Sequence, residues 1–498
     1  MKKMTDAKTQ TVAKAACGVG VLAVLSLTAL RTDAVQATKR TAAETAALEA
    51  QFVLKETPAE KAARMAWWTH DRFGMFIHFG LYAAPARHEW IRLREKISDA
   101  DYAKYLEVFN PDLFDAKEWA KAAKAAGMKY AVLTTKHHEG FCLWDTKYTD
   151  YKITKTAFGR DLVKEYVEAF RAEGLRVGFY YSLIDWHHPD FLIDDRHPLM
   201  PKGCTPGNVK GTVGGAETWR KINAGKDMAR YRKYMKDQIA ELLSNYGKID
   251  VVWFDFSYPG DQGKDCHDWD SVGIVNLART LQPGIIIDNR LDLNDTKGGW
   301  DFVSPEQFKV QAWPERDGRK VPWETCQTFS GSWGYYRDET TWKNPKQLVS
   351  LLADTVSFGG NLLLNVGPTA RGVFDARAVA RLKALGEWMR FNSRAIYGCT
   401  QAPEGLTPPN GTALTWNPRT KRLYLFLYDY PMGRLPVRFY ERIRYAQFLH
   451  DGSEIKLQPP RKGDAQNGAA ARAECGYLVL PIEPPDSVVP VVELLLKD

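Results

Sequence analysis

Short apolar runs alternate with longer helical stretches over most of this 498-residue chain. The predicted strands are rich in β-branched and aromatic residues and lie at 74–79, 130–135, 176–182, 250–254, 285–288 and 361–365, with a weak one near Phe302. The predicted helices between them cover 116–126, 160–173, 226–246, 271–281, 345–357 and 375–393. Such alternation is typical of parallel strands joined by crossover helices.

A closed (β/α)8 barrel of the TIM type, at residues 42–396, is favoured over an open sheet because the strands are apolar enough to be buried on both faces. The predicted strands number one fewer than eight, and none can be placed securely between 295 and 336. The alternation stops near Tyr397. From there short strands are separated by Pro, Gly and Asp turns, which predicts an antiparallel β-sandwich at 400–498.

The amino terminus has the order of a secretory signal. Four lysines precede an apolar run at 15–30, and small residues follow it up to Ala37. Residues 1–37 are therefore predicted to be a signal peptide of a secreted or periplasmic protein, with no stable membrane association after cleavage. The alternative is an uncleaved anchor, although the run is shorter than the ~20 residues of a membrane-spanning helix.

Charge and composition narrow the class of ligand. The formal net charge is +8, and residues 1–37 contain five basic and two acidic groups, which leaves about +5 spread over the rest. Nucleic acid is therefore not an expected partner. The chain has no Gly-x-Ser-x-Gly, Walker or Gly-x-Gly-x-x-Gly motif. Its 16 Trp, 22 Tyr and 22 Phe suit a groove that binds the faces of sugars.

In such a barrel, chemistry collects at the carboxyl ends of the strands. The polar and aromatic residues at or just after the predicted strands are His78, His137, His138, Tyr180, Trp253, Asp255, Arg290 and Glu306. Asp255 follows four apolar residues, with Trp253 two positions earlier on the same side of the strand. This pattern suits attack on the anomeric carbon of a stacked sugar. The alternative is an N-cap or an ion-paired aspartate.

A glycosidase needs a second carboxyl group as proton donor. Glu306 and Glu324 are the candidates, and the residues alone do not separate them. His78, His137 and His138 suit donors to substrate hydroxyls; a structural role and a metal site are the alternatives, and no helical metal-ligand spacing accompanies them. His187 and His188 could also line the mouth of the barrel.

Five segments in order resemble glycoside hydrolase family 29, the α-L-fucosidases. They are Phe-Gly-Met-Phe-Ile-His-Phe-Gly at 73–80, Lys-His-His-Glu-Gly-Phe at 136–141, Tyr-Tyr-Ser at 180–182 with Asp-Trp at 185–186, Trp-Phe-Asp at 253–255, and Gly-Asn-Leu-Leu-Leu-Asn-Val-Gly-Pro at 360–368. The resemblance implies a (β/α) barrel followed by a β-sandwich, and a retaining mechanism with no metal or organic cofactor. The implied substrate is a terminal α-L-fucoside of an oligosaccharide or glycoconjugate.

Residue by residue, the resemblance makes Asp255 the nucleophile. It places His78, His137, His138, Tyr180, Trp253 and Arg290 around fucose. Glu306 is the first choice for the acid/base, and Glu324 is the second choice and otherwise a substrate-binding residue. Retention requires carboxyl groups about 5–5.5 Å apart, and a neutral Glu306 requires burial or the nearby charge of Asp255. The other hypotheses are a retaining hydrolase of a related sugar such as an α-L-galactoside, and a sugar-binding protein without activity.

Overall fold

The computed structural model describes residues 40–200, 215–259, 263–460 and 475–497. The predicted signal peptide at 1–37 lies outside these ranges. Within them, no helix has both the length and the apolar character needed to cross a membrane.

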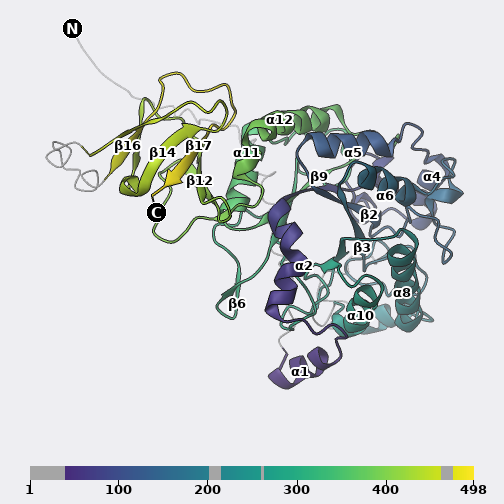
Figure 1. Ribbon diagram of the computed structural model, residues 1–498. Coiled ribbons are helices and arrows are strands. Elements are labelled where there is room, and N and C mark those ends of the chain that lie inside the picture. The colour runs from purple at the N-terminus through teal and green to yellow at the C-terminus, as the bar shows by residue number, and fades with distance from the viewer. Residues whose placement is uncertain (1–39, 201–214, 260–262, 461–474, 498) are drawn as a thin grey trace, which may run out of the picture.

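A parallel seven-stranded sheet forms the larger part of the molecule. Its strands are β1 (Phe73–Ile77), β2 (Tyr130–Lys136), β3 (Arg176–Ser182), β4 (Val251–Asp255), β5 (Ile286–Ile287), β8 (Glu324–Thr328) and β9 (Asn361–Val366). They are arranged in the order β5-β4-β3-β2-β1-β9-β8. Figure 1 shows this sheet curled on itself, with helices around its outside and α2 beside the opening.

The segment around Phe302 closes the gap between β5 and β8. Parallel bridges join Asp288 to Phe302 on one side, and Val303 to Trp323 and Glu306 to Cys326 on the other. An irregular strand thus takes the eighth position of the barrel. The sequence analysis predicted a weak strand there but missed β8, whose sequence Glu-Thr-Cys-Gln-Thr is mostly polar although every residue in it is buried.

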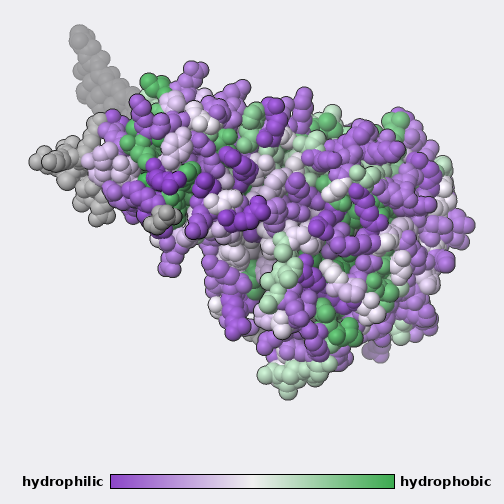
Figure 2. Space-filling model, in the orientation of Figure 1, coloured by the Kyte–Doolittle hydropathy of each residue, from purple (hydrophilic) through white to green (hydrophobic). Residues whose placement is uncertain are grey.

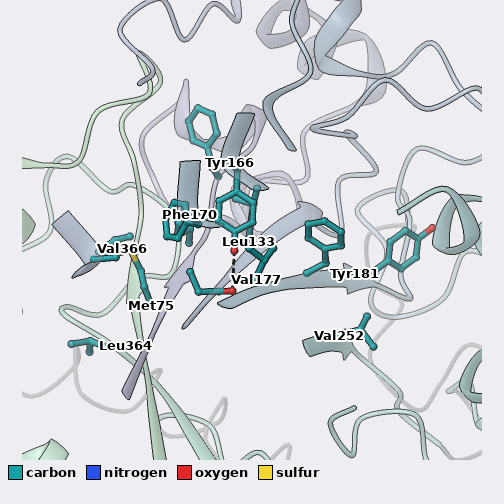
Figure 3. Close-up of a cluster of buried hydrophobic side chains, with 14 of the residues drawn as sticks. Met75, Leu133, Tyr166, Phe170, Val177, Tyr181, Val252, Leu364 and Val366 are labelled. Atoms are coloured by element: carbon teal, nitrogen blue, oxygen red, sulfur yellow. Dashed lines mark hydrogen bonds between the residues drawn. The ribbon is translucent and has the colours of Figure 1, made fainter. Parts of the chain in front are cut away.

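The helices on the outside bury one apolar face each against the sheet. In α6, Asp161 caps the first turn by accepting from the Lys164 amide at 2.9 Å. Tyr166 and Phe170, one turn apart, pack onto β2 and β3, and the Tyr166 hydroxyl donates to the Ala131 carbonyl at 2.9 Å (Figure 3). The helix is followed by Gly174 at φ 77°, a left-handed conformation that glycine adopts without steric cost.

The helices are α1 (Ala42–Ala50), α2 (Pro58–Asp71), α3 (Ile91–Arg94), α4 (Asp99–Val108), α5 (Ala116–Ala125), α6 (Leu162–Ala172), α7 (Gly215–Ile222), α8 (Met228–Asn245), α9 (Cys266–Trp269), α10 (Ser271–Leu281), α11 (Pro345–Ser357) and α12 (Ala376–Asn392). Short 3₁₀ turns lie at Leu81–Ala83, Ile153–Lys155, Ser393–Ala395 and Tyr440–Arg442.

Inward-pointing side chains fill the barrel. Phe76, Val132, Tyr180 and Trp253 come from four different strands and belong to one buried cluster, which Trp68 of α2 also joins. Because alternate residues of a strand point to opposite faces, these side chains support whatever lies at the end of the barrel above them.

The C-terminal part contains two antiparallel sheets. The first has the order β10 (Thr400–Gln401), β11 (Thr412–Asn417), β12 (Arg422–Leu427), β17 (Val491–Leu496) and β14 (Ile443–Phe448); the second has β13 (Arg434–Val437), β16 (Gly476–Val479) and β15 (Lys456–Gln458). A separate apolar cluster draws residues from both sheets. The predicted fold class, an α/β barrel followed by an antiparallel β-sandwich, is confirmed.

The first sheet packs against helices of the barrel. Tyr428 donates to Asp354 of α11 at 2.6 Å, and the Trp388 indole of α12 donates to the Val489 carbonyl at 2.8 Å. A small hairpin of β6 (Glu315–Arg316) and β7 (Arg319–Lys320) projects from the barrel in Figure 1. The face seen in Figure 2 is mostly hydrophilic, with apolar residues in small scattered groups.

Candidate active site

A cavity opens at the carboxyl ends of the barrel strands, with an empty volume of about 360 Å³ that includes its open mouth. Its lining is aromatic, basic and acidic: Phe76, His78, Trp90, His137, His138, Tyr180, Trp253, Asp255, Phe256, Glu306, Cys326 and Trp333. Seven of the residues predicted from the sequence therefore come together here. Arg290 joins them through its contacts to Asp255 and Glu306.

Asp255 is the last residue of β4 and is buried. Its Oδ2 accepts a hydrogen bond from the Tyr180 hydroxyl at 2.8 Å, and its Oδ1 accepts one from Arg290 Nη1 at 2.9 Å. Burial raises the pKa of Asp255 to about 6, with a further contribution from the charge of Glu306, while Arg290 and Tyr180 oppose the shift. The carboxylate is therefore mostly ionised at neutral pH and poorly solvated.

Arg290 is fixed on all sides. Its Nε donates to Ser304 Oγ at 3.0 Å, its Nη2 donates to the Ser304 carbonyl at 3.1 Å, and its guanidinium lies 4.4 Å from the centre of the Trp253 ring. Asn289 in turn accepts from both the amide and the hydroxyl of Ser304. The arginine thus holds a single orientation between the two carboxylates.

The two carboxyl groups lie close together. Oδ1 of Asp255 and Oε2 of Glu306 are 2.9 Å and 2.8 Å from the same nitrogen, Arg290 Nη1, so these oxygens can be no farther apart than the sum of the two distances, about 5.7 Å. Retaining glycosidases hold their carboxyl groups about 5–5.5 Å apart, and inverting enzymes about 6.5–9.5 Å. The arrangement matches the retaining class.

Glu306 is not buried. Its side chain is 40% exposed at the rim of the cavity, next to the bridge that its backbone forms with Cys326. The sequence analysis expected either burial or the charge of Asp255 to keep this acid protonated. The structure shows no such burial, and Asp255 is the carboxylate that shares Arg290 with Glu306.

Glu324 lies at the other end of the barrel. It is the first residue of β8 and pairs with Asn361, the first residue of β9. Its Oε2 accepts a hydrogen bond from the Tyr130 hydroxyl, and it does not line the cavity. Burial raises the pKa of Glu324 to about 7, and the hydrogen bond from Tyr130 opposes the shift. The structure therefore separates the two candidate acids and places only Glu306 beside Asp255.

Burial lowers the pKa values of the three histidines, that of His78 to about 4, so all three are neutral at pH 7. Nδ1 of His78 lies 2.6 Å from Asn365 Oδ1, and Nδ1 of His138 lies 2.7 Å from Ser182 Oγ. The Asn365 amide and the Ser182 hydroxyl both donate elsewhere, to the Trp333 and Ile184 carbonyls.

This network assigns the proton of His78 and of His138 to Nδ1 and leaves each Nε2 as an acceptor. Nδ1 of His137 is buried and has no hydrogen-bond partner among the described residues. The arrangement suits hydrogen bonds with sugar hydroxyls.

Trp90, Phe256 and Trp333 are cavity residues that the sequence analysis missed. Trp90 and Trp333 come from loops far apart in the chain, which Glu89 joins: its Oε2 accepts from the amides of Trp333 at 3.1 Å and Gly334 at 2.9 Å. No local pattern indicates these loops. Phe256, directly after Asp255, was the one that adjacency in the sequence could have suggested.

The histidines at 187–188 do not line the cavity. Their amides donate to Asp185 Oδ1, whose other oxygen pairs with the buried Lys136 at 3.0 Å. Over the residues that the structure describes, no cluster of three or more His, Cys, Asp or Glu is arranged to hold a metal ion. Cys142, Cys266, Cys326 and Cys399 are buried thiols.

Comparisons with known proteins agree on one family. A family model described as Alpha-L-fucosidase matches residues 40–394. The plasma alpha-L-fucosidase of Homo sapiens is 30% identical over 390 residues, which cover 74% of this chain and 76% of that protein. An alpha-L-fucosidase of Dictyostelium discoideum is 28% identical over 402 residues, covering 73% and 78%.

Solved structures show the same similarity. Alpha-L-fucosidase isoenzyme 1 from Paenibacillus thiaminolyticus has a TM-score of 0.76 and 42% identity, covering 88% of this chain and 100% of its own. A GH29 alpha-L-fucosidase from Bacteroides thetaiotaomicron, solved as a trapped covalent intermediate with 2-fluoro-fucosyl fluoride, has a TM-score of 0.72 and 27% identity, covering 89% and 97%.

Proposed function

The chain belongs to the α-L-fucosidase family, and from this premise we propose that it removes terminal α-L-fucose from oligosaccharides or glycoconjugates with retention of configuration. The observation that carries the proposal is the contact of Asp255 and Glu306 with one nitrogen of Arg290, which limits the separation of their nearest oxygens to about 5.7 Å.

In the first step the Asp255 carboxylate attacks carbon 1 of the fucoside. The bond from carbon 1 to the leaving oxygen breaks, Glu306 gives its proton to that oxygen, and a fucosyl ester of Asp255 forms. In the second step Glu306 takes a proton from water as the water oxygen attacks carbon 1. The ester bond breaks, which releases α-L-fucose and restores the Asp255 carboxylate.

Arg290 and Tyr180 hold the Asp255 oxygens in place for the attack. When the ester forms, the negative charge of Asp255 disappears and the Glu306 carboxylate keeps its contact with Arg290. Glu306 thus faces an anion when it acts as an acid in the first step and a neutral ester when it acts as a base in the second.

The neutral histidines and Trp253 would bind the sugar itself. His78, His137 and His138 present ring nitrogens to hydroxyl groups, and the Trp253 ring, stacked 5.8 Å from that of Tyr180, offers an apolar surface. Hydrogen bonds to the 2-hydroxyl strengthen as positive charge develops on the sugar ring and so lower the barrier.

The test is the product anomer together with covalent trapping. Incubation with a 2-fluoro fucosyl fluoride should label the peptide that contains Asp255, and proton NMR should detect α-L-fucose as the first product. Inverted product or a label on another peptide would refute the proposal. Hydrolysis of an α-L-galactoside in preference to the fucoside would favour the related-sugar hypothesis, and binding without release of reducing sugar would favour the sugar-binding protein.

We also propose that the protein acts outside the cytoplasm, on the basis of the sequence of residues 1–37. Amino-terminal sequencing of the protein from the producing cell should give a start near residue 38. A start at residue 1 would contradict cleavage.

A further inference from the structure

A buried ion pair lies outside the lining of the cavity. Lys136 is the last residue of β2, and Asp185 lies in the loop that follows β3. Nζ of Lys136 donates to Asp185 Oδ2 at 3.0 Å, and the two side chains are 0% and 1% exposed. Because both charges must be taken out of water, a buried ion pair is often no more stable than well-packed apolar residues. Stability alone therefore does not account for this pair.

The ion pair holds both sides of the turn that carries His138. Lys136 lies two residues before His138 in the chain. On the other side, Asp185 directly precedes Trp186, whose amide donates to the His138 carbonyl at 2.8 Å. The turn also packs directly onto the carboxylate, since a Cβ at Gly140, which has φ 82°, would lie 2.3 Å from Asp185 Oδ1.

Neighbouring groups fix each charge of the pair. Oδ1 of Asp185 accepts from the amides of the second and third residues after it, at 3.0 Å and 2.9 Å. The Lys136 ammonium lies 4.4 Å, 5.7 Å and 5.6 Å from the centres of three aromatic rings, which belong to Tyr181, Tyr231 and Tyr234. The pair is thus held in a single arrangement from which the turn can be positioned.

The His138 ring lines the cavity, so its place depends on the backbone of this turn. Burial lowers the pKa of His138, and nearby basic groups, among them Lys136, lower it further. We propose that Lys136 and Asp185 are positioning residues, which hold the turn where the His138 ring meets a hydroxyl of the fucosyl group. This inference rests on the proposed fucosidase function and adds to it two residues outside the cavity lining.

The experiment separates position from stability. Lys136→Met leaves a buried carboxylate without its cation and should lower the unfolding temperature. Lys136→Met combined with Asp185→Asn removes both charges, and the asparagine oxygen can still accept from the two amides. This double variant should recover most of the unfolding temperature of the parent chain. Its kcat/KM should nevertheless stay about tenfold lower, because a small displacement of a substrate-binding group is enough for such a loss.

The loss should concern the fucosyl group alone. In the double variant, kcat/KM should decrease equally for α-L-fucosyl fluoride and for a fucosylated disaccharide, because both present the same hydroxyls to His138. The inhibition constant of a fucose-shaped iminosugar should rise by a similar factor. A variant that had only lost stability would bind this inhibitor as the parent chain does, at a temperature where both are folded.

Arg279→Met is the matched control. It breaks another buried ion pair, that with Asp301 at 2.5 Å, away from the cavity. It should lower the unfolding temperature and leave the inhibition constant unchanged.

Recovery of both the unfolding temperature and kcat/KM in the double variant would overturn the inference. If that variant does not fold, Asp185→Asn alone gives the second measure, since it keeps an acceptor for Lys136 and weakens the bond: an inhibition constant equal to that of the parent chain would also overturn the inference. If the unmodified protein releases fucose from neither substrate, the proposed function itself fails.

Discussion

Arg290 contacts Glu306 at 2.8 Å through Nη1, the same nitrogen that binds Asp255 at 2.9 Å. One cation thus lies between two carboxylates that have opposite tasks in a retaining glycosidase. Its charge offsets their repulsion, and its fixed bonds to Ser304 keep the geometry constant when a proton moves between substrate and Glu306.

The pKa of Asp255 should set the acid limb of the pH profile. Asp255 must be ionised to attack, and its pKa is raised to about 6, so kcat/KM should fall as the pH drops through about 6. Tyr180→Phe removes a hydrogen bond that favours the ionised form. The limb should then move to higher pH, as measured with an aryl fucoside between pH 4 and 8. An unchanged limb would mean that another group controls it.

Removal of the two carboxyl groups should have different kinetic signatures. Asp255→Gly should lower turnover by several orders of magnitude, with partial rescue by azide, because azide can attack carbon 1 in place of the carboxylate. Glu306→Ala should lose most on substrates with poor leaving groups, which need the proton. Near-normal turnover of Asp255→Gly would end the assignment.

Glu324→Ala serves as the matched control for the acid. It removes a carboxyl group at the far end of the barrel, so its losses should not depend on the leaving group. A steeper dependence on leaving group in Glu324→Ala than in Glu306→Ala would reverse the two roles.

Glu324 should make folding stability depend on pH. Its pKa is about 7 in the folded protein, against an ordinary pKa of 4.5 for a glutamate side chain. Below about pH 4.5 the group is protonated in both states and its contribution is fully present. As the pH rises towards 7 the unfolded chain ionises first, so the free energy of unfolding should fall, by roughly 3 kcal/mol. Glu324→Gln should remove this decrease in the free energy of unfolding, as measured by chemical denaturation at pH 4.5 and 7.5. An equal decrease in both proteins would contradict the raised pKa of Glu324.

Arg40 should support the active site from the amino-terminal arm. It pairs with Asp292 at 2.7 Å and Asp295 at 2.6 Å, in the loop that begins with Arg290. Arg40→Ala should loosen that loop, lower kcat/KM about tenfold and move the acid limb to higher pH, because Arg290 holds the pKa of Asp255 down.

Arg64→Ala is the control for a general loss of stability. Arg64 also lies near the amino terminus and pairs with Glu56 at 2.6 Å and Asp301 at 2.7 Å, away from the cavity. It should lower the unfolding temperature without moving the acid limb. Equal shifts of the limb in the two variants would reduce the role of Arg40 to stability alone.

Local patterns in the sequence determined much of the architecture. Apolar strands and amphipathic helices leave a periodic pattern in the sequence. Six strands of the barrel, six of its helices and the change to antiparallel strands near Tyr397 were therefore predictable, whereas α2, α3, α4, α7 and α9 were not among the predicted helices. Strand ends also located Asp255, the histidines and Arg290, because a polar residue directly after an apolar run is a local feature.

Other features depended on partners distant in the chain. Strand β8 is polar and yet buried, because groups distant from it in the chain or in its flanking loops bind its side chains: Tyr130 donates to Glu324, and the Phe308 carbonyl accepts from Gln327. Composition alone cannot show that. The residues next to Glu306 and Glu324 did not show which of the two is the acid. The pairing of Glu324 with Asn361 puts it at the start of its strand, at the end of the barrel opposite the cavity. The sequence thus determined which residues could carry the chemistry. The register of the sheet and the packing of its loops decided which of these residues meet, because strand pairing brings together residues that no local pattern connects.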